Sequence, residues 1–462
     1  MFKLVVIVIL FWNHILGLNL TIHDYDNPSA SHILDADIID DILIVSGMIG
    51  GIEFYDISNP EILNHLTSFN LSSGGGGGGG GGAKPNCIKA VENYAYVTTK
   101  NGVAILNISN PSNPQSLGYI SGTSNMILEN LDIVNNILAV AAHEDGVLLY
   151  DISNPTNPQF LETIETENAW MVYMENSTLF IGDESQLVMY SINELNNQTT
   201  YILTLDMPNS IKDIVGDNYG YLYVALGTDG VMALNLGTNF SPSIIDTYNT
   251  TALANRLEML EGKVAVSDWD DVEVLEINNG LLEKVGYKNT TRRTMAIATK
   301  ENYIYSAEWA SIQIFEFGEI EEADIDLSAY ELNYPFVESG ESYTLSLDVT
   351  NNGGSTFILN EAYVTNSEFS PSGLGNLEPG ETQTIDVTYT ANAANASGSY
   401  RIYSNDTDQN EIYCETNGNI NGANIGQEAP DFELSIIANG SGTFKLSDYI
   451  GQVVVLAFFA PN

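Results

Sequence analysis

A single phrase returns at regular intervals along this chain and restricts its fold more than any other feature. It reads YDISNP at Tyr55–Pro60, LNISNPSNP at Leu106–Pro114 and YDISNPTNP at Tyr150–Pro158. The steps between successive copies are 51, 44, 40, 44, 41 and 40 residues. A period of about 40–45 residues with several strands in each unit is typical of a β-propeller blade. The residue two before the serine aligns in seven copies, of which the last four are weak: Asp56, Asn107, Asp151, Ser191, Asn235, Glu276 and Glu316.

Each unit contains three clear strands, and a tight hairpin joins the second strand to the third. Asn101-Gly102, Asp145-Gly146 and Asp229-Gly230 are the dipeptides that primed hairpin turns require. The Asn-Pro pair then ends the third strand, and a more variable fourth strand follows. Seven copies therefore predict seven blades. The long first step contains nine consecutive glycines, Gly74–Gly82, which we interpret as a flexible insertion loop.

The last copy, which ends near Phe317, lacks an obvious fourth strand. Residues Asn19–Tyr25 (NLTIHDY) have the pattern of a strand and offer the missing one. We expect this segment to pair there, because it would close the ring and cover an open sheet edge.

The residues DIIDDILIVSGMIGGIEFYDISNP and their copies resemble the LVIVD repeat family, whose consensus runs as short strands that end in D-I-S-N-P. The resemblance covers about residues 33–317 and is strong in three units. It implies a bacterial surface or secreted β-propeller, usually without an assigned reaction. We assign residues 19–322 to this propeller, with the glycine run 74–82 as an insertion.

The N-terminus has the pattern of a secretory signal peptide. Lys3 is followed by an apolar run, Leu4–Trp12, that is too short to span a bilayer. We predict a signal peptide over residues 1–18, cut near Gly17, with an uncleaved anchor as the alternative. No later apolar run reaches spanning length, so we expect an extracytoplasmic location, which means periplasmic, cell-surface or secreted.

The charge balance restricts the partners. The chain has 14 Lys and Arg against 60 Asp and Glu, a net charge of −46. Nucleic-acid binding needs a basic patch that releases counterions, and docking on an anionic membrane needs a similar surface. We therefore expect neither partner. Lysine is scarce and Asn, Ser, Thr and Gly are abundant, which favours a mainly β fold over a helical one.

A second domain follows the repeats over residues 323–421. Alternating segments such as Tyr343–Val349 and Thr384–Tyr389 predict about seven short strands in an antiparallel sandwich. The order N-x-G, P-G-E, S-N-D in VTNNGGSTFILNEAYV, LEPGETQTIDVTYTA and GSYRIYSNDTDQNEI resembles Ig-like domains of the choice-of-anchor and ASPM/SPD-2/hydin type. The resemblance implies a spacer or adhesive unit.

Residues 422–462 form a third segment. Ala429–Phe432, Leu446–Asp448, Gly451 and the apolar run Val453–Phe459 resemble the opening of redoxin domains. That thioredoxin-like family contains the alkyl hydroperoxide reductase/thiol-specific antioxidant proteins and periplasmic thiol–disulfide reductases. In the family a reactive Cys comes next, at a helix N-terminus that lowers the thiol pKa.

The five residues Phe458–Asn462 occupy the positions directly before that reactive Cys. We therefore expect an incomplete thioredoxin-like α/β segment, and no redox turnover from these 462 residues. Three interpretations of the chain end stay open: a truncated record, a genuine stop, or a selenocysteine codon read as a stop.

Few residues carry recognisable chemistry. Cys87 and Cys414 lie in different expected domains, so we interpret them as structural thiols. No His-x-His or His-x-x-x-His spacing occurs, and no metal ligands or cofactors are assigned. The acidic stretch Ser267–Asp271 lacks the alternating calcium-loop pattern, which makes solvated charge the preferred interpretation.

The hairpin turns between second and third strands should gather on one face of the ring. Their acidic and aromatic residues form the predicted ligand-binding face, which recognises a glycan, a peptide or a cation. The alternative for Trp269 and Trp309 is packing between blades. The only basic pair, Arg292-Arg293, is expected to neutralise nearby acids. The residues of this face are His143, Glu144, Asp145, Asp183, Asp229, Asp268, Trp269, Asp270 and Trp309, with Glu184 and Glu308 beside them.

Two functions follow from the sequence. The first is a secreted multidomain binding or scaffold protein whose propeller recognises an unknown protein, peptide or glycan. The alternative is a thiol- or selenol-dependent oxidoreductase in the full-length product, peroxiredoxin-like or a thiol–disulfide reductase.

Overall fold

The computed structural model describes residues 17–71, 83–193, 195–238, 240–392, 395–419, 433–435 and 443–446. Within these ranges the chain consists of strands and turns and contains no α-helix. It divides into two compact units, Leu18–Glu319 and a second one that starts at Ile320. Among the described residues, no helix is long and apolar enough to cross a bilayer.

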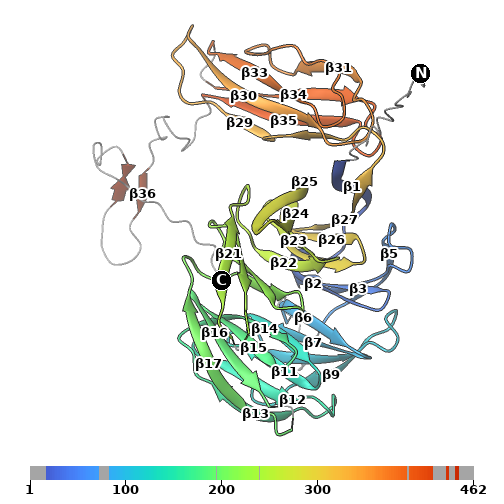
Figure 1. Ribbon diagram of the computed structural model, residues 1–462, viewed down its shortest axis with the longest axis vertical. Coiled ribbons are helices and arrows are strands. Elements are labelled where there is room, and N and C mark those ends of the chain that lie inside the picture. Colours follow the sequence, from blue (N-terminus) through green and yellow to red (C-terminus); the bar gives the residue numbers. More distant parts are fainter. Residues whose placement is uncertain are drawn as a thin grey trace, which may run out of the picture. The chain divides into compact units, whose positions relative to one another are not determined.

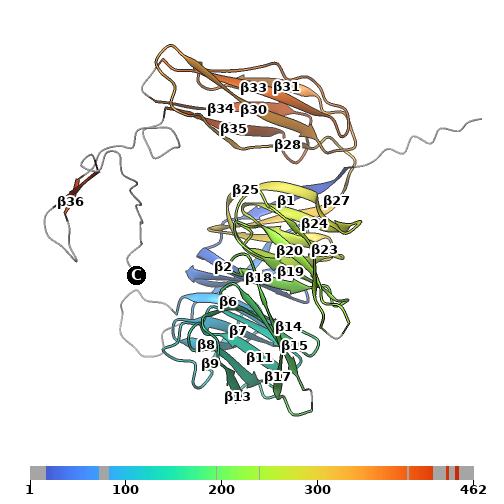
Figure 2. The same cartoon turned by 60° about the vertical axis from the view of Figure 1, so that its left-hand side comes forward.

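The first unit is a series of four-stranded antiparallel sheets in which strands follow one another in sequence order (Figures 1 and 2). The first three sheets are β2 (Ser31–Ile39), β3 (Ile42–Ile49), β4 (Gly51–Asp56) and β5 (Asn64–Phe69); β6 (Pro85–Val91), β7 (Tyr94–Thr99), β8 (Gly102–Asn107) and β9 (Gln115–Tyr119); and β10 (Asn130–Val134), β11 (Ile137–Ala141), β12 (Val147–Asp151) and β13 (Gln159–Ile164). The next two are β14 (Ala169–Glu175), β15 (Thr178–Asp183), β16 (Gln186–Ile192) and β17 (Thr199–Asp206); and β18 (Asp213–Gly216), β19 (Tyr221–Ala225), β20 (Val231–Asn235) and β21 (Ser243–Tyr248).

The remaining strands of this unit form one seven-stranded sheet in the order β1-β27-β26-β25-β24-β23-β22. Its 20-residue strand β25 pairs with β24 through its first part and with β26 through its end. The strands are β22 (Arg256–Leu260), β23 (Lys263–Ser267), β24 (Trp269–Asn278), β25 (Leu281–Lys300), β26 (Tyr303–Glu308), β27 (Ser311–Ile320) and β1 (Gly17–Asp26).

The inner strands form a closed ring. Each first strand, from β2 through β6, β10, β14, β18 and β22 to β25, contacts the next one, and β25 contacts β2. Buried apolar side chains from neighbouring sheets fill the space between them, as in the cluster of Cys87, Tyr96, Leu131 and Leu148. Close packing of these faces is the main source of stability for such an arrangement.

The recurrent D-I-S-N-P phrase is a turn with a defined hydrogen-bond pattern. The carboxylate of Asp56 accepts from the N–H of Ser58 at 2.8 Å, and Asp151 does the same for Ser153 at 2.8 Å. This side-chain turn lowers the pKa of Asp151, because the bonds stabilise its charged form. The following N–H, that of Ile152, donates to the carbonyl of Asn136 at 2.8 Å. The motif therefore fixes the third strand to the first hairpin of its own sheet.

Carboxylates and amides join one inner strand to the next. The N–H of Ile88 donates to Asp35 Oδ2 at 2.9 Å, and that of Leu257 donates to Asp213 Oδ2 at 2.7 Å. Each acceptor precedes its donor by roughly one repeat, 53 residues across the glycine insertion and 44 residues elsewhere. An inner strand has one edge without a strand partner, and its N–H groups are costly when buried unpaired. The acidic side chain of the preceding repeat satisfies them.

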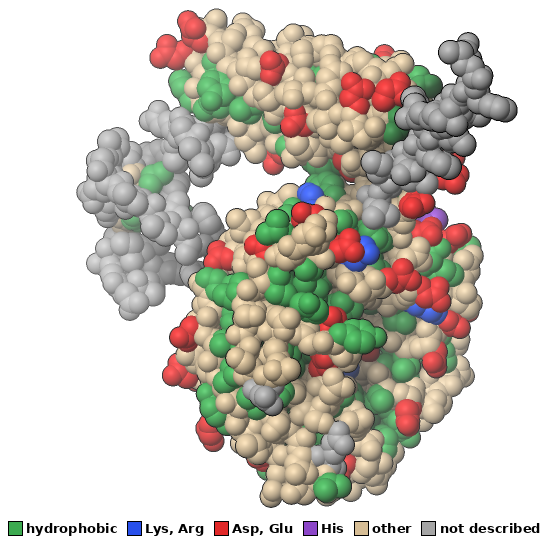
Figure 3. All heavy atoms as spheres, in the orientation of Figure 1, with side chains coloured by type: hydrophobic (Ala, Val, Ile, Leu, Met, Phe, Trp, Pro, Cys, Tyr) green, Lys and Arg blue, Asp and Glu red, His purple; other side chains and the backbone are tan. Residues whose placement is uncertain are grey.

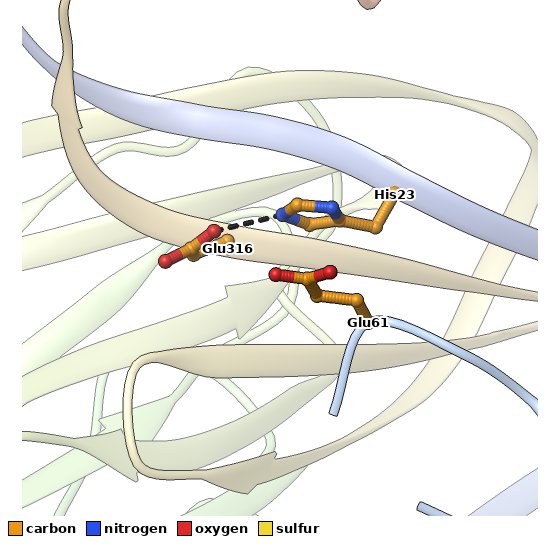
Figure 4. Close-up of side chains that lie close together, drawn as sticks. All are labelled: His23, Glu61 and Glu316. Carbon is orange, nitrogen blue, oxygen red and sulfur yellow. Dashed lines mark hydrogen bonds and ion pairs between the residues drawn. The ribbon is translucent and has the colours of Figure 1, made fainter. Parts of the chain in front are cut away.

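Strand β1 closes the ring, as its sequence pattern predicted, by pairing with β27. Asp24 and Asp26 of β1 accept from the N–H of Leu63 and the hydroxyl of Tyr55 in the first repeat, both at 2.8 Å. Figure 4 shows His23 of β1 directed at Glu316 of β27, with Nε2 to Oε2 at 2.8 Å and Glu61 beside them. The N-terminal strand thus binds the first and the last repeat together.

The second unit contains a sandwich of two four-stranded sheets. The sheets are β28 (Ile325–Leu327), β30 (Ser342–Asn351), β33 (Thr382–Thr390) and β32 (Phe369–Pro371), and β29 (Glu331–Asn333), β35 (Glu411–Gly418), β34 (Ala396–Ser404) and β31 (Leu359–Val364). Both sheets contribute to one buried cluster that includes Leu347, Tyr389, Tyr400 and Ile412. The hydroxyl of Tyr334 donates to the Val387 carbonyl at 2.7 Å, which satisfies a polar group inside that core.

Of the segment that resembles a redoxin domain, only a short ladder is described, in which β36 (Glu433–Ser435) pairs antiparallel with β37 (Thr443–Lys445). The signal-peptide residues before Gly17 and the glycine run lie outside the described residues, as do Ala429–Phe432 and Val453–Asn462. The predictions for those segments stay predictions.

The inner-strand carboxylates generate a stability prediction. Replacing Asp213 with Ala leaves the buried N–H of Leu257 without its acceptor, so we expect a loss of about 1–3 kcal/mol of unfolding free energy. Asp213→Asn keeps an acceptor oxygen and should lose less than the Ala variant. The exposed acid Glu165 is the control, because Glu165→Ala should change the unfolding free energy by less than about 0.5 kcal/mol. Equilibrium urea unfolding measures all three, and equal losses for the Ala variants would contradict the role assigned to Asp213.

Candidate functional site

One face of the ring carries most of the residues that the sequence singled out. In an antiparallel sheet, the turn between second and third strands lies at the same end as the connection from the fourth strand to the next repeat. We call the surface made by these turns and connections the hairpin face. His143, Asp229, Trp269 and Trp309 lie in its turns. They belong to different repeats, so they are distributed around the ring and do not form one cluster.

Two residues predicted for this face are buried. Asp183 is 7% exposed and accepts from the N–H groups of Glu167 and Asn168 at 3.0 and 2.6 Å. Asp268 is fully buried and accepts from the N–H of Ala252 at 2.7 Å. The connections leading into inner strands have N–H groups without strand partners, and these acids satisfy them. Asp183 and Asp268 are therefore buried in the hairpin face, and their assignment to ligand binding stays a prediction.

Trp269 and Trp309 are neither fully exposed for recognition nor fully packed between blades, which were the two roles considered from the sequence. Both are half-buried, and each covers a residue of the following or first repeat. The ring of Trp309 lies 4.3 Å from that of His32, measured between centroids. The guanidinium of Arg293 lies over Trp269 at 4.8 Å from its ring centroid. Arg293, expected to neutralise acids, instead makes a cation–π contact with this indole.

The most open aromatic on the hairpin face is Trp170, which the sequence analysis missed. It is 42% exposed, although it is the second residue of the inner strand β14. The pairing of β14 with β15 shifts register between Ala169 and Met171, so Trp170 is the extra residue of a β-bulge. A bulge re-aims a side chain, and here it turns the indole out of the sheet.

Trp170 lies in an open pocket of about 300 Å³ between the fourth and fifth repeats. The Nζ of Lys212 lies 5.8 Å from the indole centroid, and the ring of His143 meets Trp170 edge-on at 4.7 Å. The pocket is lined by Asn168, Trp170, Glu184, Ser185, Ser210, Ile211 and Lys212. It therefore offers an apolar surface, a cation, a carboxylate, an amide and hydroxyl groups within one depression.

Hydrogen bonds hold the wall of this pocket in place. The imidazole of His143 contacts Asn168 Oδ1 through Nδ1 at 2.9 Å and Glu129 Oε2 through Nε2 at 3.3 Å. Glu144 and Asp145, in the same turn as His143, are exposed, as is Asp270 three repeats further along the ring. Figure 3 shows acidic side chains spread over the visible surface with few basic ones. A basic side chain such as Lys212 is therefore a local exception on this protein.

The central channel is too small for an organic ligand. Its cavity has a volume of about 80 Å³, room for only two or three water molecules. Charged side chains line it and pair with one another: Lys89 Nζ lies 3.6 Å from Asp37 and 3.9 Å from Glu258. Burial raises the pKa of Asp132 and Asp213 to about 6 and that of Glu258 to about 7. The charged side chains of the channel therefore bind one another and the backbone of the inner strands.

A second, larger cavity of about 500 Å³ lies on the opposite face, between the bottoms of the third and fourth repeats. Its walls are turns that hold D-I-S-N-P residues, including Asp151 and Ser153, and amide side chains such as Asn136 and Asn176. It contains no aromatic residue, so the hairpin face remains the better recognition surface.

The two cysteines are structural, as predicted. Both are free and buried. Burial raises the pKa of Cys87 and raises that of Cys414 to about 12, which keeps both thiols protonated. Neither is a candidate nucleophile.

Comparison with known proteins agrees with this geometry. The LVIVD repeat family matches residues 82–119 and 129–166, which are the second and third sheets. No curated protein matches the chain. The WD40 β-propeller domain of Doa1 is 10% identical, with a TM-score of 0.50 over 65% of this chain and 97% of that one. A chain of the Mitotic Checkpoint Complex is 10% identical, with a TM-score of 0.51 over 65% of this chain and 92% of that one. The chain thus contains LVIVD repeats in a β-propeller fold, which confirms that part of the sequence prediction.

The channel carboxylates predict the pH dependence of stability. Because burial raises the pKa values of Asp132, Asp213 and Glu258, the folded state binds protons that the unfolded state has already released. Their contribution is complete below the unfolded values of about 4 and is lost as the pH rises through about 6 to 7. The unfolding free energy should therefore fall between pH 5 and pH 8 in urea titrations. Glu258→Gln should make that fall shallower, and a stability that increases over this range would contradict the assignment.

Proposed function

We propose that this chain is an extracytoplasmic binding or scaffold protein whose seven-bladed propeller recognises a peptide segment of a partner protein at the Trp170 pocket. The observation that carries the proposal is the exposed indole of Trp170, turned outwards by a β-bulge beside Lys212. Tryptophan is one of the residue types that most often anchor protein recognition, especially in a depression that the partner can fill.

The sheets support the proposed count of seven blades. Five sheets have four strands, and the seven-stranded sheet separates into two units if β25 serves first as the outer strand of one and then as the inner strand of the next. Strand β1 then supplies the fourth strand of the last unit. The proposed ring has seven blades, of which the fourth and fifth form the recognition pocket.

The chemistry of the pocket favours a peptide over a sugar. Lys212 and Glu184 bring opposite charges to the lining of the Trp170 pocket. Such a pair matches side chains of both signs in an extended peptide, and the indole takes an apolar anchor between them. A glycan is the runner-up, since indole faces also stack on sugar rings. No cofactor is assigned, and neither nucleic acid nor an anionic membrane surface is a proposed partner, because the net charge is −46.

The remaining parts of the proposal rest on sequence. Residues 1–18 are proposed as a signal peptide and residues 422–462 as the start of a redoxin domain. The sandwich over residues 323–421 is proposed as an Ig-like spacer, which agrees with its two sheets around one core. The oxidoreductase alternative finds no support in Cys87 or Cys414, because both thiols are buried and protonated.

The proposal is tested by panning the full chain against a phage-displayed library of random dodecapeptides and measuring the affinity of an enriched peptide by calorimetry. Trp170→Ala should weaken binding at least about tenfold, as expected for an anchor residue. Tyr219→Ala is the matched control, because Tyr219 is 91% exposed and lies in a turn of the opposite face. Enriched peptides that bind the Trp170 variant as tightly as the unmodified chain would refute the site, and enrichment on an oligosaccharide array alone would favour the glycan.

A further inference from the structure

Three carboxylates lie together in the sixth repeat, away from the Trp170 pocket. Asp268 precedes β24, and Asp271 and Glu273 are on that strand. Their exposed fractions are 0%, 1% and 0%. One oxygen from each lies within 4.8 Å of the others. The sequence interpretation of this stretch as solvated charge was wrong for Asp268 and Asp271, because the connection before β22 and the neighbouring strands cover them.

Each carboxylate has one oxygen with a partner and one without. Asp268 Oδ2 accepts from the N–H of Ala252 at 2.7 Å and contacts Thr251 Oγ1 at 2.8 Å. Asp271 Oδ2 lies 2.5 Å from that same hydroxyl, and Glu273 Oε1 lies 3.2 Å from Lys284 Nζ. Asp268 Oδ1, Asp271 Oδ1 and Glu273 Oε2 are buried and have no hydrogen-bond partner. Buried unpaired acceptors are costly, and three together call for a common ligand.

The Thr251 hydroxyl strengthens this conclusion. It has a single proton and yet contacts carboxylate oxygens of both Asp268 and Asp271. One proton cannot serve two acceptors at full strength. One of the two carboxylate oxygens therefore contacts the Thr251 oxygen with no hydrogen between them, unless the cluster shares a further proton or a cation.

Other repeats treat the same positions differently. Four of them place a glycine with positive φ where Asp271 stands, namely Gly51, Gly102, Gly146 and Gly230. In the sixth repeat the left-handed conformation is taken by Trp269, at φ 61°, and position 271 carries a carboxylate. The first repeat has Glu53 at the position of Glu273, and there Ser29, the N–H of Ala30 and His65 satisfy it at 2.6, 2.8 and 2.9 Å. The sixth repeat has the acid without that set of donors.

The charge balance indicates the missing partner. Three carboxylates and Lys284 leave two negative charges in a buried space, where an uncompensated charge is strongly disfavoured. Burial and mutual repulsion raise the pKa of Asp271 to about 9 and that of Glu273 to about 7, and they raise those of Asp268, Asp270 and Tyr248 as well. The cluster therefore holds either protons or a divalent cation.

We propose that Asp268, Asp271 and Glu273, each with a buried oxygen that lacks a hydrogen-bond partner, bind a calcium ion together. Calcium prefers oxygen ligands at about 2.3–2.6 Å, so two ligands on opposite sides of it lie about 4.6–5.2 Å apart, which the 4.8 Å limit of the cluster permits. Magnesium requires ligands at about 2.0–2.1 Å in near-ideal octahedral geometry, whereas the flexible coordination of calcium tolerates an irregular set of carboxylates. The ion fastens the turn of Trp269 to the connection that holds Thr251 and Ala252.

The test is thermal unfolding of the full chain at pH 8, first in EDTA and then with 5 mM CaCl₂. Calcium should raise the unfolding temperature by at least about 3 °C in the unmodified chain. Asp271→Asn should abolish the shift, because it removes one ligand charge. Asp270→Asn is the matched control, since Asp270 is the exposed acid next to it, and it should keep the shift. Magnesium at the same concentration should raise the unfolding temperature less.

Terbium gives a second measurement that does not depend on a variant that loses a ligand. Trp269 is two residues from Asp271, so its indole is close enough to sensitise terbium emission at the cluster. Emission should appear in the unmodified chain, fall when calcium is added, and be lost in Trp269→Phe, which keeps the calcium shift. No calcium shift at pH 8, an equal shift in Asp271→Asn, or terbium emission that calcium does not displace would each overturn the proposal. A cluster that only holds protons gives the first of these results.

Discussion

The unpaired edge of each inner strand is the constraint on which the rest of the propeller depends. These edges face a channel whose cavity is only about 80 Å³, so water alone is a limited source of partners for their N–H groups. The chain places a carboxylate or an amide one repeat earlier, as Asp35 does for Ile88 and Asp213 for Leu257. This gives the repeats a regular spacing and explains why acids line the channel of a protein that has few basic residues.

Regular features of the fold could be predicted from the sequence because they depend on local chemistry. The Asp-Gly and Asn-Gly dipeptides do lie in hairpins, although only their glycines have positive φ, so the turns are not of the primed type that the sequence predicted. Asp151 binds Ser153 two residues away, so the phrase D-I-S-N-P implies a turn wherever it occurs. The pairing of β1 with β27 could be predicted because the last repeat lacked a fourth strand and the N-terminal residues had the pattern of an unassigned strand. These inferences needed no knowledge of how distant residues pack.

The candidate site was less accessible because it depends on which side chain occupies an inner-strand bulge, a feature that β2, β6 and β25 share with β14, and on which acids the connections cover. Trp170 is exposed through a register shift between Ala169 and Met171, and nothing in the alternation of β14 announces it. Asp268 looks like a surface acid in sequence but is covered by Ala252 and Thr251 from a connection 16 residues earlier. A usable signal did exist for the acidic cluster: position 271 is an aspartate where four other repeats have glycine. Comparing the repeats position by position would have found it.

The pairing of the N-terminal strand β1 with β27, near the end of the propeller, has a consequence for how the protein folds. His23 meets Glu316 across 293 residues of sequence, so the ring cannot close until almost the whole propeller has left the ribosome. Contacts of such long range slow folding, and an open ring exposes the free edges of β27 and β2 while it waits. Repeats joined by local hairpins can form one after another during synthesis. The last step is the return of the chain's own beginning, which makes the N-terminal strand the part whose timing governs completion.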